Sequence, residues 1–131
     1  LTASAVDCSS GDIIQALTIP GDSVILWAGF QVVESATMNT GSNATAVLGT
    51  AVDPNEYVTA FDIDGAADLA YAPTVAAAGV VVNASADTMD LTFAGDGATF
   101  TAGKLRVFCM LMDVSEVGDH TAQTVDRDTL A

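Results

Sequence analysis

The chain has 131 residues, of which 17 are acidic and 3 are basic, and half of its residues are hydrophobic. The length suits one domain, and the hydrophobic content excludes an intrinsically disordered chain. No apolar run approaches the roughly 18–20 residues that a membrane-spanning helix needs. Nucleic-acid binding is not expected, because phosphate recognition relies on clustered basic side chains and only Lys104, Arg106 and Arg127 are present. These figures predict a soluble, acidic, globular domain that needs neither membrane nor nucleic acid.

The kinds of residue present favour an all-β fold. Glu34, Glu56 and Glu116 are the only glutamates, and the long polar side chains that dominate helix surfaces are scarce. Aspartate prefers turns, whereas valine and threonine suit pleated strands. Two interpretations of the acidity are open: adaptation to a saline, halophilic or marine setting, where salt screens self-repulsion, and simple solubilisation of an apolar-rich protein.

Alternating hydrophobic residues, separated by the turn residues Gly, Pro and Asp, predict seven or eight short strands. Polar arms are expected at residues 1–10 and 116–131, around a domain spanning 11–115. The expected strands are, in chain order, 12–19, 24–34, 43–50, 57–63, 79–82, 88–94 and 104–113. Residues 66–78 are alanine-rich and ambiguous, with Pro73 arguing against a continuous helix. Such a series indicates a single β-sandwich or jelly-roll-like domain.

The individual strands carry more detailed expectations. Alternation in the first strand places Ile13, Leu17 and Ile19 on one face. In the next strand it groups Val24, Leu26, Ala28, Phe30 and Val32 on one side, and Gly29 suggests a bulge or close approach. The strands at 88–94 and 104–113 are expected to form a hairpin.

Catalysis is not expected, because no nucleophile, phosphate-binding or dinucleotide motif is present. His120 is the only histidine and lies in the polar C-terminal stretch. The candidate metal site is Asp62, Asp64 and Asp68, which surround a glycine and offer the oxygen ligands that calcium prefers. A plain Asp-Gly turn is the favoured interpretation of the same residues, so no cofactor other than calcium is considered.

The last strand has apolar residues on both faces. Leu105, Val107, Cys109 and Leu111 form one face, whereas Phe108, Met110 and Met112 lie on the other. The second face, with Trp27, is a candidate oligomer interface, since aromatic residues and methionine are enriched there; a second layer within one domain explains it equally well. Cys8 and Cys109 show no zinc-ligand spacing, and a disulfide between them is left open.

The succession DIIQALTIPGDSVILWAGFQVVESAT, followed by ADTMDLTFAGDGATFTAGKLRVFCMLMDVS, resembles small β-sandwich structural proteins of tailed viruses of prokaryotes. The resemblance covers roughly residues 11–115 and consists of strand and turn patterns. It implies a virion protein on the outer capsid surface, often a homotrimer, seated on the major capsid protein. Cys8, Cys109 and the stretch after Val114 are outside that pattern.

These observations predict a non-enzymatic capsid decoration or cement protein that stabilises the shell by binding its assembled state. The alternatives are a tail or fibre-base component of the virion, and an extracellular adhesin or calcium-dependent binding module. A small hydrolase using paired carboxylates ranks last.

Overall fold

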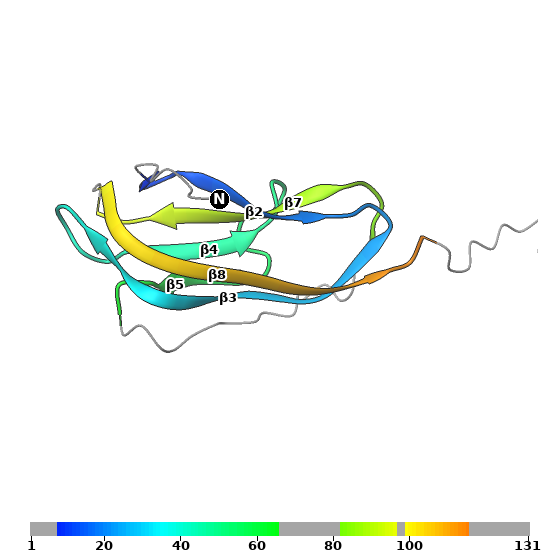
Figure 1. Ribbon diagram of the computed structural model, residues 1–131. Coiled ribbons are helices and arrows are strands. Elements are labelled where there is room, and N and C mark those ends of the chain that lie inside the picture. Colours follow the sequence, from blue (N-terminus) through cyan, green and yellow to red (C-terminus); the bar gives the residue numbers. More distant parts are fainter. Residues whose placement is uncertain (1–7, 66–81, 97–98, 116–131) are drawn as a thin grey trace, which may run out of the picture.

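The structure, a computed structural model, describes residues 8–65, 82–96 and 99–115 (Figure 1). These residues contain strands and turns, and among them no helix is long and apolar enough to cross a membrane. The strands are β1 (Cys8–Ser9), β2 (Ile13–Ile19), β3 (Ser23–Met38), β4 (Thr45–Gly49), β5 (Val58–Asp62), β6 (Val82–Asn83), β7 (Asp87–Ala94) and β8 (Thr99–Asp113). The expected all-β fold is confirmed.

Two four-stranded antiparallel sheets pack face to face as a β-sandwich (Figure 1). Sheet A has the strand order β1-β8-β3-β6, and sheet B has the order β2-β7-β4-β5. The core between them is apolar because alternate side chains of each strand point inward. Phe30 of sheet A and Leu48 and Met89 of sheet B are fully buried there.

β3 and β8 are the two longest strands of sheet A and form its central pair. The two strands run antiparallel from the Ser23–Asp113 pair to the Met38–Phe100 pair, with several register shifts. One shift lies between Ile25 and Trp27 and exchanges the faces of the residues around it. Ala28, Phe30 and Val32 face the core as expected, but Ile25, rather than Leu26, packs against it.

Most expected strands are present, with altered ends. The structure extends the second strand to Met38 and starts the last one at Thr99, so both are longer than expected. In β2 a register shift between Gln15 and Leu17 turns Ile13 away from the core, where it is 60% exposed. The expectation that Ile13 lies on the same face as Leu17 is therefore wrong.

The expected hairpin between residues 88–94 and 104–113 is also wrong. β7 pairs with β2 and β4 in sheet B, whereas β8 pairs with β3 and β1 in sheet A. The chain between β7 and β8 crosses from one sheet to the other, so a short connection joins strands that are neighbours in sequence but not in a ladder. Alternation within each strand could not reveal this, because an inward face looks alike in either sheet.

Several expectations fall on residues that the structure leaves undescribed. Residues 8–9 of the expected N-terminal arm form β1, whereas 1–7 and the C-terminal arm 116–131 lie outside the described residues. The ambiguous stretch 66–78 and residues 79–81 of the expected fifth strand lie outside them as well.

Candidate functional site

The outer face of sheet A carries a cluster of large apolar side chains, here called the outer patch: Leu26, Trp27, Phe108, Met110 and Met112. The register places Trp27 opposite Met110 and Gly29 opposite Phe108, across the β3–β8 ladder. Met110 is 58% exposed, Met112 49% and Leu26 41%. The structure thus brings together the four residues that the sequence suggested as an interface, and adds Leu26, which projects at the register shift.

Two aromatic rings organise the outer patch. The Trp27 and Phe108 rings stack with their centroids 4.8 Å apart and their planes 16° from parallel. Because Gly29 stands opposite Phe108 and has no side chain, the neighbouring strand leaves room for this arrangement. Stacked rings have few rotatable bonds and a large apolar area, which suits a binding surface.

The outer patch borders the basic side chains of the described residues. Lys104 and Arg106 lie further along the same face of β8, both exposed. The Arg106 guanidinium donates to the Gln31 side-chain carbonyl at 3.5 Å, and Glu34 stands opposite Lys104 in the ladder. Most described acidic side chains lie instead in turns and at strand ends, where Asp22 and Asp53 are examples.

The candidate calcium residues build a turn. The Asp62 carboxylate accepts hydrogen bonds from the Asp64 and Gly65 backbone N–H groups, at 3.0 and 3.1 Å. The Asp64 carboxylate accepts from the Ala44 N–H at 3.1 Å, and this bond holds the pKa of Asp64 below its usual range. Asp68 lies outside the described residues. Within the described part of the chain, no three His, Cys, Asp or Glu side chains gather as a metal site.

The two cysteines are free thiols in the structure. Burial raises the pKa of both, and nearby Asp12 raises that of Cys8 further. A raised pKa keeps a thiol protonated and weakly nucleophilic. These residues therefore act as small apolar side chains that pack against the core.

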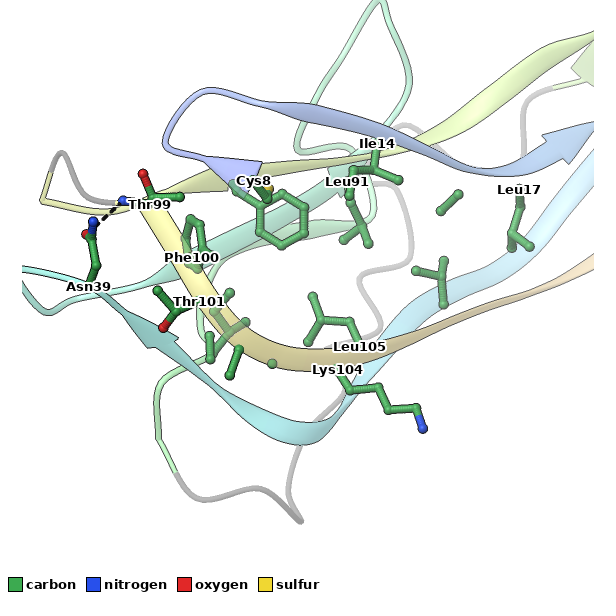
Figure 2. Close-up of a pocket in the computed structure, with 17 residues that line it drawn as sticks. Cys8, Ile14, Leu17, Asn39, Leu91, Thr99, Phe100, Thr101, Lys104 and Leu105 are labelled. Carbon is green, nitrogen blue, oxygen red and sulfur yellow. Dashed lines mark hydrogen bonds between the residues drawn. The ribbon is translucent and has the colours of Figure 1, made fainter. Parts of the chain in front are cut away.

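The structure also shows a feature that sequence reasoning missed. A cleft of about 920 Å³ opens between β2 of sheet B and β8 of sheet A (Figure 2). Ile14 and Leu17 line one wall, and Leu105 and Val107 line the other. Cys8 and Phe100, which pair where β1 meets β8, close one end. The lining comes from residues far apart in sequence, so no local motif could have signalled it.

Comparison of the chain with protein-family models, with curated proteins and with solved structures found no match.

Proposed function

We propose that this chain is a non-enzymatic structural protein of a virion, a decoration or cement protein on the outer surface of the capsid. The observation that carries the proposal is the outer patch, because Leu26, Met110 and Met112 are exposed together beside the half-buried rings of Trp27 and Phe108, and exposed apolar patches mark interaction surfaces. In this proposal the outer patch seats the protein on the major capsid protein, and the acidic turns face solvent.

Charge supports a shell-facing role for this side of the molecule. The chain carries a formal net charge of −14, yet Lys104 and Arg106 both project beside the outer patch. Basic side chains at the rim of an apolar contact favour acidic partners and speed the encounter. An acidic surface elsewhere keeps the bound protein solvated and discourages contact with packaged nucleic acid.

A cement protein acts by mass action, since anything that binds only the assembled shell stabilises it. The bound area therefore decides the effect, and the outer patch provides large side chains for a contact of this kind. No catalytic step is required, and the fold acts as a rigid platform that presents one sheet face.

Co-sedimentation with capsids that lack this protein tests the proposal. Met110→Asp puts a charge in the middle of the outer patch at a position already 58% exposed, so the fold is expected to persist. We expect this variant to lose binding by at least about tenfold, which corresponds to about 1.4 kcal/mol. Val52→Asp is the matched control, because Val52 is 91% exposed in the loop after β4 and lies outside the outer patch.

The outcomes separate clearly. Binding by the parent chain and by Val52→Asp, with loss in Met110→Asp, supports the proposal. If the parent chain does not sediment with the shells, or if Met110→Asp binds as well as the parent, the proposed docking is wrong. Light scattering of the unbound protein tests the separate prediction of a homotrimer.

A further inference from the structure

The short strand β1 leads the chain onto one edge of β8. β3 pairs with β8 on one side, and β1 pairs with it on the other, where Cys8 stands opposite Phe100. The β1–β8 pairing is antiparallel, so the direction of β1 at Cys8 points the preceding chain toward the later residues of β8. Residues 1–7 precede β1 and lie outside the described residues.

The apolar cleft lies beside this edge of β8. Cys8 lies at one end of the cleft, and Leu105 and Val107 line its β8 wall further along (Figure 2). On the opposite wall Ile14 is 46% exposed, and Leu91 lies deeper, only 4% exposed. None of the described residues that line the cleft is acidic. Because burying an unpaired charge is costly, this lining suits a strand with neutral, apolar side chains.

The apolar residues before β1 match the cleft face of β8. The β1–β8 register, continued without a shift, sets Ala3 opposite Leu105 and Leu1 opposite Val107. Residues directly opposite each other in an antiparallel pair share one face of the sheet. Leu105 and Val107 both line the cleft, so the same register places the two apolar side chains on the cleft side.

The polar residues before β1 match the outward face of β8. In the same register Ser4 stands opposite Lys104 and Thr2 opposite Arg106. Lys104 and Arg106 are both exposed, and the Lys104 ammonium group points away from the cleft (Figure 2). A shift of one residue would put the two hydroxyl groups into the cleft instead. The sequence order apolar, polar, apolar, polar therefore fits this edge in one register.

We propose that residues 1–7 continue β1 along β8 as a strap that closes the cleft. Leu1 and Ala3 lie inside the cleft against Ile14 and Leu17 of β2. The backbone of the strap pairs the β8 edge, which otherwise is a template for a strand of another molecule. The strap does not rest on the proposed function, since it protects the sheet edge whether or not a shell is present.

The strap belongs to the same molecule rather than to a second copy. Cys8 already pairs with Phe100 of its own chain, so Asp7 is held within one residue of the edge and the local concentration of the strap is high. A second copy carries the same net charge of −14 and is repelled at close approach.

Amide hydrogen exchange followed by NMR tests the strap in the full chain. Successive backbone N–H groups of a strand point to opposite edges, so about every second amide of residues 101–107 points away from β3. We expect these amides to be protected in the full chain and to exchange at least about tenfold faster in a chain that starts at Cys8. The amides of the same stretch that point toward β3 are the internal control and should change less.

Two neighbouring substitutions provide a matched pair in the full chain. Ala3→Asp puts a carboxylate into the apolar cleft, so it should release the strap and speed exchange of the amides that point away from β3 at least about tenfold. Ser4→Asp adds the same group on the outward face, opposite Lys104, and exchange should stay like that of the parent chain.

Three results would overturn the strap. They are fast exchange of the amides that point away from β3 in the full chain, their continued protection in the chain that starts at Cys8, and equal effects of Ala3→Asp and Ser4→Asp. Protection that rises with protein concentration would assign the edge to a second copy and overturn it as well. No shell takes part in these measurements, so their failure leaves docking through the outer patch standing.

Discussion

The two sheets each have four strands, but their outer faces differ in the kind of side chain that they carry. Sheet B presents threonines of β2, β4 and β7, at Thr18, Thr45, Thr88 and Thr92, together with the exposed Ile13. The chain itself also covers part of this face, because the loop after β4 folds back against Gly49. Sheet A presents exposed Met110 and Met112 beside the half-buried, stacked rings of Trp27 and Phe108. One outer face is thus rich in hydroxyl groups, whereas the other is rich in large apolar side chains.

This difference shows that the apolar excess of the sequence serves two purposes. Inward residues such as Phe30 stabilise the sandwich, whereas outward residues such as Phe108 add little to the core. The same residue type is therefore expected to respond differently to mutation on the two sides of one sheet, and the following predictions measure that difference.

The largest expected effect compares two phenylalanines of sheet A. Phe30 is fully buried and meets the Phe61 ring edge-on, with centroids 5.8 Å apart. Phe30→Ala should lower the free energy of unfolding by about 3–5 kcal/mol. Phe108→Ala should cost only about 1–2 kcal/mol, mainly from its stacking with Trp27. Urea denaturation of both variants measures the difference, and equal losses would mean that the outer patch belongs to the folding core.

Gly49→Ala should be the next most destabilising change, because it disturbs the loop that covers part of the outer face of sheet B. An added Cβ would lie 2.0 Å from the Asp53 carbonyl oxygen and 2.4 Å from the Pro54 carbonyl carbon. Both atoms belong to the backbone, so relief requires the loop to move, at a cost of about 1–3 kcal/mol. Thermal unfolding measures this loss, and Ala51→Ser, a change at an exposed position in the same loop, is the control. A parent-like melting temperature for Gly49→Ala would contradict the packing of this loop.

A smaller effect is expected at alkaline pH. Burial, and then the neighbouring Glu56, raise the pKa of Tyr57 to about 12, from a usual value of 10. In that interval the unfolded chain releases the phenolic proton before the folded chain does, so stability should fall as pH rises from about 10 to about 12. Tyr57→Phe should lessen this fall. Denaturation midpoints at pH 9 and 11 measure it, and an equal fall in both proteins would show that Tyr57 is not the group responsible.

The sequence predicted the class of fold because alternation and turn residues are local signals. Met89, Leu91 and Phe93 alternate with polar residues and are buried as that pattern requires. The pairing of β8 with β3 was not predictable in this way, since it joins residues far apart in the chain. Bulges in β2 and β3 also move some side chains to the opposite face of the sheet. A bulge depends on backbone geometry, which the alternation of residues along the sequence does not reveal.

The outer patch was predictable in part for the same reason. Phe108, Met110 and Met112 share a face by simple alternation along one strand, so the sequence could group them. Their proximity to Trp27 required the ladder between β3 and β8. The cleft between β2 and β8 was not predictable, because it depends on how the two sheets lie relative to each other, which no single strand encodes.

Electron cryo-microscopy of intact particles tests the central claim most directly. The account predicts density for this chain on the outer capsid surface, with the outer patch of sheet A against the major capsid protein and the threonine face of sheet B toward solvent. Density with sheet A facing solvent, or particles without this chain on the capsid, would contradict it.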